Sequence, residues 1–216
     1  MRKIYDTQLK LLKQKMSDMY LRMEQSITDT VECIATGDKR RASEVIARDS
    51  EIDLLNEEIQ QLCFRLILTE QPVAQDLRTI SSAMKMITDM ERIGDHAEDI
   101  CEIIVESKED GLALDYGHIS QMASAVMSMV KDSIQAFVSG DIALCESIGK
   151  YDDVVDDLFE KARNDVILLI RHDVKYSEKA LDLFTIAKYF ERIGDHATNI
   201  AEWVIFAITG EHPSLQ

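Results

Sequence analysis

The sequence predicts an all-α fold built from two tandem, similar three-helix bundles. The heptapeptide ERIGDHA occurs twice, at Glu91–Ala97 and at Glu191–Ala197, so the chain contains two copies of one unit. Apolar residues recur at intervals of three or four through long segments, which is typical of amphipathic helices. Only two prolines and eight glycines interrupt 216 residues, and no segment shows the sustained alternation of a β-strand.

The first two helices of each repeat are joined by a tight turn. With an offset of 103 residues, Gly37-Asp38 matches Gly140-Asp141, and in both places the glycine is expected to end one helix and the aspartate to cap the next. The helix before each turn carries one apolar stripe, and the stripe is apolar at every matched position. Its members are Met16, Met19, Met23, Ile27, Val31 and Ile34 in the first copy, and Ile119, Met122, Val126, Val130, Ile134 and Phe137 in the second.

The third helix of each repeat carries the heptapeptide, where the offset is 100 residues. The second copy is therefore three residues shorter between its second and third helices, which predicts loops near residues 69–74, with Pro72, and near 172–177. In chain order, we expect helices at residues 5–36, 39–68, 73–107, 117–139, 141–171 and 176–209. A linker is expected at residues 107–117, between a first repeat at residues 1–109 and a second at residues 110–216.

The composition restricts the kinds of partner. A formal net charge of −16 argues against nucleic acid, because most of the surface would repel a phosphate backbone. Basic partners or bound cations fit this charge better. The chain shows neither an apolar run of about 18 residues nor a secretory segment. Its four cysteines form no C-x-x-C pair and fall among apolar residues, so we expect free, buried thiols in a cytoplasmic protein.

Pairs of carboxylates four residues apart are the candidate site. Residues at this spacing share a helix face, and like charges there repel, so they need a cationic partner. Antiparallel packing of the second and third helices would bring four carboxylates together in each repeat. Such hard oxygen ligands suit Fe, Mn, Mg, Ca or Zn, whereas Arg92 and Arg192 are the local alternatives to a metal. The candidate ligands are Glu91, Asp95, Asp49 and Asp53 in the first repeat and Glu191, Asp195, Asp152 and Asp156 in the second.

Two features near these pairs leave alternatives open. Asp152-Asp153 and Asp156-Asp157 offer two faces of one helix, and the offset of 103 favours Asp152 and Asp156. His96 and His196 are rotated off the carboxylate line, so we expect them on the surface or facing a partner.

The chain contains no Glu-x-x-His of the kind that ferritin-like di-iron proteins use, and no nucleophile, base and orienter arrangement. The sequence therefore predicts no enzyme.

The chain resembles the PhoU family over nearly its whole length. The resemblance is carried by the two three-helix repeats, by ERIGD on each third helix, and by the segments RDSEIDLLNEEI, YDDVVDDLFEKA and QPVAQDLR. It implies metal clusters, of iron or zinc or else of manganese or magnesium, in multinuclear form on the eight carboxylates named above. It also implies a cytoplasmic negative regulator of phosphate uptake and phosphate-starvation signalling. Its partners would be the ATPase subunit of the phosphate ABC transporter and the phosphate-sensing histidine kinase.

The sequence is also compatible with two other functional classes of protein. One is a carboxylate-bridged iron storage or redox protein, and another is a metal-free helical adaptor whose carboxylates pair with arginine and lysine. A homodimer is expected, since exposed acidic sites can be shared between subunits.

Overall fold

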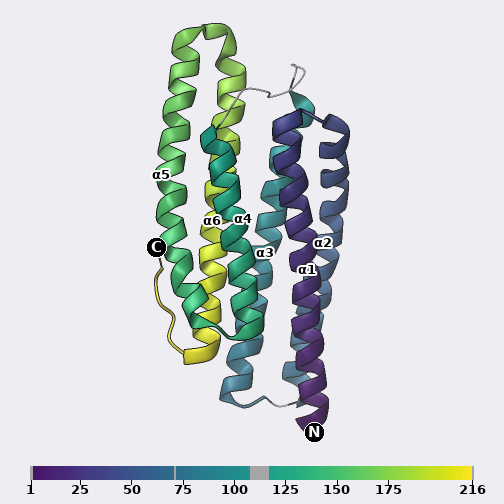
Figure 1. Cartoon of the computed structure of the whole chain (residues 1–216). Helices are drawn as coiled ribbons and strands as arrows, with labels where there is room; N and C mark the ends of the chain where they lie inside the picture. The colour runs from purple at the N-terminus through teal and green to yellow at the C-terminus, as the bar shows by residue number, and fades with distance from the viewer. Residues whose placement is uncertain (1, 71, 108–116, 216) are drawn as a thin grey trace.

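The computed structural model describes residues 2–70, 72–107 and 117–215, and these residues form six α-helices and one short 3-10 helix (Figure 1). The elements are α1 (Arg2–Thr36), α2 (Lys39–Glu70), α3 (Ala74–Glu106), α4 (Gly117–Ser139), α5 (Ile142–His172), η1 (Val174–Tyr176) and α6 (Ser177–Thr209). No strand occurs among the described residues, so the all-α prediction is confirmed. The six predicted helices agree with the observed bounds to within a few residues. The predicted boundary between residues 109 and 110 lies outside the described ranges.

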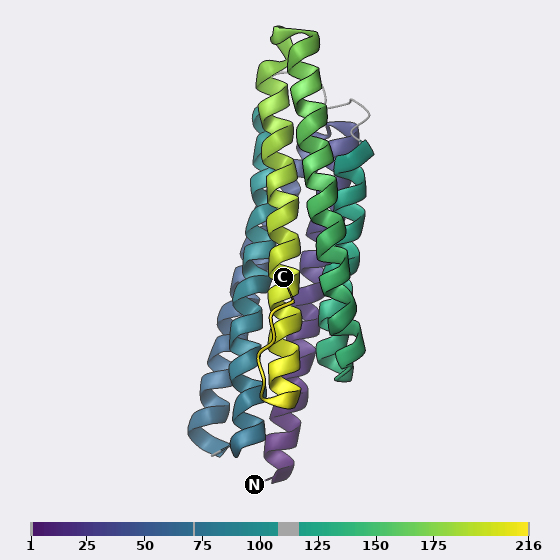
Figure 2. The ribbon, with the colours of Figure 1, turned by 90° about the vertical axis from the view of Figure 1, so that its left-hand side faces the viewer.

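The helices run alternately up and down, and each repeat forms one antiparallel bundle (Figure 1). Helix α3 packs against α1 and α2 in the first bundle, and α6 packs against α4 and α5 in the second. The two bundles meet mainly where α3 and α6 lie side by side. The hairpin of α5 and α6 projects beyond the other helices at one end of the molecule (Figure 2). The third helix of each repeat, which carries ERIGDHA, is therefore central to the whole molecule.

The predicted apolar stripes form the core. All six matched positions of α4 are buried, and so are those of α1 except Val31, which is partly buried against the same core. The methionines Met16, Met19 and Met23 have no exposed side-chain surface, as expected for flexible side chains that fill gaps between helices. The four cysteines are free and buried, which confirms their predicted role as small apolar residues.

The two predicted tight turns are present. Gly37 and Gly140 have φ values of 70° and 74°, the left-handed region that favours glycine at a helix end. Asp38 Oδ1 then accepts hydrogen bonds from the backbone N–H groups of Arg40 and Arg41 at 3.0 and 3.1 Å. Asp141 caps α5 in the same way. Two residues thus end one helix and start the next, which makes the paired helices antiparallel neighbours.

Two side chains at the start of α3, Gln75 and Arg78, contact the C-terminal end of α6 in the other repeat. Gln75 Nε2, in the first turn of α3, donates a hydrogen bond to the carbonyl oxygen of Ala207 at 2.9 Å. This carbonyl is one of the last in α6, where the helix itself supplies no donor. The guanidinium of Arg78 lies against Gly210, whose φ of 84° ends α6. The start of α3 therefore supplies a hydrogen-bond donor to a carbonyl group at the C-terminal end of α6.

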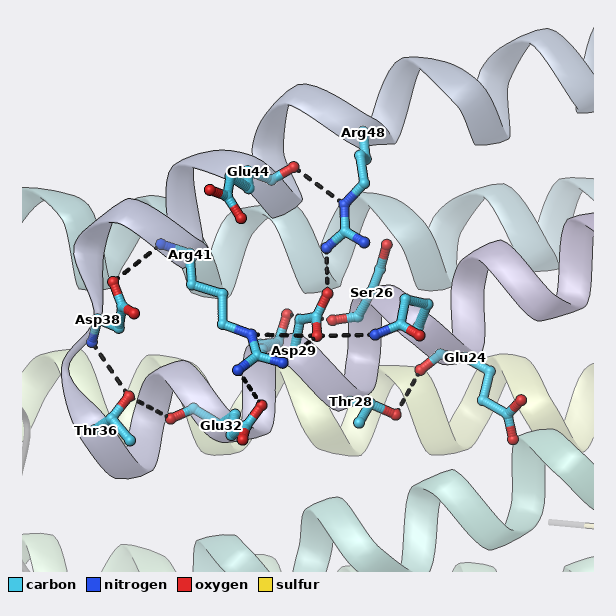
Figure 3. Close-up of polar contacts among 12 residues, drawn as sticks. Glu24, Ser26, Thr28, Asp29, Glu32, Thr36, Asp38, Arg41, Glu44 and Arg48 are labelled. Carbon is cyan, nitrogen blue, oxygen red and sulfur yellow. Dashed lines mark hydrogen bonds and ion pairs between the residues drawn. The ribbon is translucent and has the colours of Figure 1, made fainter.

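A buried carboxylate fixes α1 against α2. Asp29 is only 4% exposed; the guanidinium of Arg41 donates to its Oδ1 and that of Arg48 to its Oδ2 (Figure 3). Gln25 donates a further hydrogen bond at 2.9 Å. Burial alone would raise the pKa of Asp29, but the hydrogen bonds from Arg48, Arg41 and Gln25 hold it below its ordinary value.

Within the described ranges, none of the helices combines the length and apolar character that crossing a membrane would require.

Candidate metal centre

The first repeat brings three carboxylates into one cluster. Asp49 and Asp53 come from α2 and Asp95 from α3, and one oxygen of each lies within 4.8 Å of the others. Asp49 is 9% exposed, so this cluster is partly withdrawn from water. Glu91, one turn before Asp95, accepts a hydrogen bond from Asn56 Nδ2 of α2. The four candidate residues of this repeat therefore lie on the facing sides of α2 and α3.

Glycine at position 94 permits this close approach of the helices. A Cβ atom there would lie 3.0 Å from Asp49 Oδ1 and 3.0 Å from Ile52 Cδ1. Both neighbours are almost completely buried and have little room to move. At Gly194, the nearest atoms would be at 3.6 Å or more, which is ordinary van der Waals contact. The identical heptapeptides thus contain one glycine that is tightly packed by neighbouring side chains and one that leaves room for a Cβ atom.

Alanine at the two glycines is expected to act in opposite directions. Gly94→Ala should destabilise the protein by about 1–2 kcal/mol, because overpacking outweighs the gain in helix propensity. Gly194→Ala, the matched control, should be neutral or stabilising by up to about 1 kcal/mol. Urea unfolding of both variants checks this, and equal midpoints would contradict the tight packing at Gly94.

Crowding raises the pKa values of the first cluster. Burial raises the pKa of Asp49 to about 7. The charges of Glu98, Asp53 and Asp95 act in the same direction. Burial also raises the pKa of Glu91, with Asp95 and Asp53 adding to it. Negative charge is thus concentrated here beyond what the local cations neutralise, although Arg92 pairs with Asp95 at 2.8 Å.

Glu98 belongs to this cluster and is absent from the residues that the sequence predicts. Its charge helps to raise the pKa of Asp49, and burial together with Glu102 and Asp95 raises its own pKa. The comparison of repeats favours residues present in both copies, and the counterpart of Glu98 is Thr198. A usable signal was its position three residues after Asp95 and seven after Glu91, on the same helix face.

The second repeat gathers its four candidates differently. Burial raises the pKa of Asp195 to about 6, and Glu191 and Asp152 contribute. Burial also raises the pKa of Asp156, with Glu191 as the next cause. The charge of Glu191 helps to raise the pKa values of Asp152 and Asp156, so the face chosen by the offset of 103 is the one beside Glu191. Thr198 Oγ1 donates to Asp152 Oδ1 at 3.2 Å, where the first repeat has the carboxylate of Glu98.

A lysine accompanies the second cluster. Lys188 Nζ forms an ion pair with Glu191, and its charge lowers the pKa values of Asp156 and Asp195. Thr88 stands at the corresponding position of the first repeat. The first cluster has more carboxylates and no such lysine, so its donor set fits a divalent cation with hard oxygen ligands better than the second.

The two histidines of the heptapeptides lie between the repeats, so the prediction of a surface position is wrong, whereas a role in facing a partner stays a prediction. His96 of α3 and His196 of α6 have ring centroids 5.6 Å apart, and their side chains are 12% and 23% exposed. Burial lowers the pKa of His96. The packing of α3 on α6 turns these rings toward one another, which helical spacing within a single repeat does not reveal.

Comparison with known proteins gives one consistent result. The sequence profile of the family described as PhoU domain matches residues 16–104 and 119–204. A curated relative of *Clostridium acetobutylicum*, named phosphate-specific transport system accessory protein PhoU homolog, is 34% identical over 99% of this chain and 98% of its own length. A homolog of the same description from *Thermotoga maritima* is 33% identical over 96% of this chain and 90% of its own length.

Solved structures agree with the sequence comparisons. The crystal structure of PhoU from *Pseudomonas aeruginosa* superposes with a TM-score of 0.91 at 30% identity, covering 96% of this chain and all of the other. The phosphate transport system regulatory protein PhoU from *Streptococcus pneumoniae* gives a TM-score of 0.88 at 26% identity, covering 97% of this chain and 99% of the other.

Proposed function

Since this chain belongs to the PhoU family, we propose that it is an accessory protein of a phosphate-specific transport system. In this role it restrains phosphate uptake and phosphate-starvation signalling when phosphate is plentiful. It does so in the cytoplasm, by binding the ATPase subunit of the transporter and the phosphate-sensing histidine kinase, and without catalysing a reaction. The names of the full-length relatives support the accessory role.

The observation that supports a metal-dependent form of this role is the cluster of Asp49, Asp53 and Asp95 between α2 and α3. These oxygens would hold a cation, iron or zinc or else manganese or magnesium, whose charge offsets their repulsion. With the repulsion removed, α2 and α3 can pack closely along the exposed edge of the bundle. The state of the cluster would then determine the shape of the acidic surface that partners contact.

The two clusters are expected to differ in affinity. In the second repeat, the ammonium of Lys188 already supplies one positive charge to the carboxylates. A cation entering there would have to displace this ion pair. We therefore propose that Asp49, Asp53, Glu91 and Asp95, with Glu98, form the tighter site, and that Asp152, Asp156, Glu191 and Asp195 form the weaker one.

Elemental analysis tests the metal. Untagged protein, purified without chelator, is expected to retain metal that an Asp95→Ala/Asp195→Ala variant loses. An Asp6→Ala/Glu160→Ala variant, which removes two exposed carboxylates outside both clusters, should retain it. A wild-type protein that stays empty after reconstitution would contradict metal binding at these carboxylates.

Binding to the two partners tests the accessory role separately. We expect the metal-loaded protein to bind the purified ATPase subunit and the kinase, and the Asp95→Ala/Asp195→Ala variant to bind both more weakly. Deletion of the gene should raise phosphate uptake in phosphate-rich medium. Unchanged uptake together with no binding to either partner would contradict the accessory role, whatever the metal content.

A metal-free helical adaptor is the second candidate. The ion pairs of Lys188 with Glu191 and of Arg92 with Asp95 favour it, because they partly neutralise both clusters without a metal. This candidate predicts that a chelator changes neither thermal stability nor partner binding.

A further inference from the structure

The seam between the two repeats holds a second group of metal-type ligands. His96 projects from α3 and His196 from α6, so one ring comes from each repeat. Their ring centroids are 5.6 Å apart, with an angle of 34° between the ring planes. Their side chains are 12% and 23% exposed, so both rings are mostly buried but keep some contact with solvent. The phosphate-accessory role does not use this pair.

A carboxylate holds each ring by the same nitrogen. Nδ1 of His196 lies 2.8 Å from Asp89 Oδ1, and Nδ1 of His96 lies 3.3 Å from Asp99 Oδ2. Asp89 is itself held by Asn199 Nδ2 at 3.3 Å. A proton on each Nδ1 would leave Nε2 with its lone pair for a ligand. A carboxylate on one imidazole nitrogen and a metal on the other is the usual environment of a metal-ligating histidine.

The spacing of the rings fits a shared ion. Two imidazoles bound to one tetrahedral metal, with metal–nitrogen distances of about 2.0–2.1 Å, have ring centroids roughly 5 Å apart. The observed centroid separation of 5.6 Å is close to this value. The two tethering aspartates lie on opposite sides of His96 along α3, seven residues before it and three after it. The two rings are therefore tethered at Nδ1 by carboxylates from different turns of α3.

The charge of the surroundings is compatible with a cation. Arg192 is the cation near His96, and its guanidinium carbon lies 6.0 Å from the ring centroid of Tyr189. Tyr189 in turn packs on His96, with centroids 5.3 Å apart. The carboxylates of Asp89 and Asp99 together exceed the charge of Arg192. A divalent ion would thus enter a region of net negative charge.

We propose that His96 and His196 form a two-histidine site for a transition-metal ion, with Zn²⁺ as the expected ion, between the repeats. Imidazole ligands favour Zn, Cu, Fe and Ni, whereas the carboxylate clusters suit harder cations, so this site is chemically distinct from both clusters. Water molecules would complete the coordination. Because one ligand comes from each repeat, occupancy would tie α3 to α6 and stabilise the contact between the bundles.

Two measurements test the site. Electron paramagnetic resonance of protein with one equivalent of Cu²⁺, in excess Mg²⁺ to compete at the carboxylates, reports nitrogen ligands directly. We expect coupling to two imidazole nitrogens in the wild type and in His172→Gln, an exposed histidine at the end of α5. His96→Gln and His196→Gln should each lose at least one of these couplings. Zn²⁺ should raise the Tm of the wild type and the control, but not that of either seam variant.

The outcomes are distinguishable from those for the carboxylate clusters. Coupling to two imidazole nitrogens that survives unchanged in both seam variants, or an equal rise in Tm with Zn²⁺ in all four proteins, would overturn the proposal. Glutamine can still hydrogen-bond the neighbouring aspartate, and circular dichroism checks that the variants remain helical. Asp89→Asn provides a second variant that keeps both rings. It should lower the affinity for Zn²⁺ by about 10- to 100-fold, and an unchanged affinity would contradict the proposed role of Asp89.

Discussion

Replacing both Arg41 and Arg48 with alanine is expected to destabilise the protein by about 3–5 kcal/mol, because the double change leaves a buried carboxylate without a cation. The side chain of Asp29 is only 6% exposed, and these two guanidinium groups are the cations that contact it (Figure 3). Among the side chains that the structure describes, Gln25 would then remain as the donor to this carboxylate. Urea unfolding at pH 7 measures the loss.

Neutralising the carboxylate should rescue this variant. Adding Asp29→Asn to the double alanine variant replaces the unpaired charge with an amide, and we expect recovery of more than half of the loss. Arg40→Ala is the control, since that side chain is 85% exposed and its change should cost less than about 0.5 kcal/mol. If the double and triple variants unfolded at the same urea concentration, burial of charge would not be the cause.

The pH dependence of this network follows from the lowered pKa of Asp29. A carboxyl group whose pKa is lower in the folded state contributes stability above its unfolded pKa, near 3.8. That contribution is lost as the pH falls through the folded value. The difference between the wild type and the double alanine variant should therefore be largest at neutral pH and should shrink under strong acid.

Asp49→Asn is expected to stabilise the metal-free protein at pH 8 by an amount on the order of 3 kcal/mol. The folded-state pKa of Asp49 is about 7, against an ordinary value of 3.8. Each unit of such a shift corresponds to about 1.4 kcal/mol, and rearrangement of the neighbouring acids reduces the total. Above pH 7, the folded wild type must hold a crowded, charged carboxylate that the variant lacks.

The sign of the pH effect distinguishes this site from the Asp29 network. Between about pH 4 and pH 7, folded wild-type protein binds a proton at Asp49 that the unfolded chain releases. The free energy of unfolding therefore falls as the pH rises through this window. We expect the advantage of Asp49→Asn, measured by urea unfolding in the presence of a chelator, to disappear toward pH 5.

Addition of a divalent metal should make the wild type more stable than Asp49→Asn, the reverse of their order without metal. If the cluster holds a cation, the wild type gains stability on metal addition, whereas Asp49→Asn has lost one ligand and gains less. Asp153→Asn, an exposed residue of α5, serves as the control and should follow the wild type. An advantage of Asp49→Asn that stays constant from pH 5 to pH 8 would contradict charge crowding at this position.

The sequence was sufficient for the helices and their order. The apolar stripes, the Gly-Asp turns and the repeat offsets depend on residues within a few turns of one another, and local spacing determines which face of a helix is apolar. The same logic selected Asp49, Asp53 and Asp95, because a short connection makes consecutive helices antiparallel neighbours. These features would be predicted from any chain with the same pattern.

The contents of each site depended on contacts between helices that local spacing does not encode. Glu98 joins the first cluster and Lys188 the second, although neither recurs in the other repeat. The predicted surface positions of His96 and His196 were wrong, because α3 of one repeat packs on α6 of the other.

By itself, therefore, the sequence determined that this protein is a pair of three-helix bundles with carboxylates on facing helices. The tertiary structure alone decided which cations accompany those carboxylates, which of the two heptapeptide glycines is tightly packed, and that two histidines meet between the repeats. The physical reason is the distance along the chain between the residues that interact. Periodicity reports on one helix, whereas the register and closeness of two packed helices arise from the fit of side chains distant in the chain.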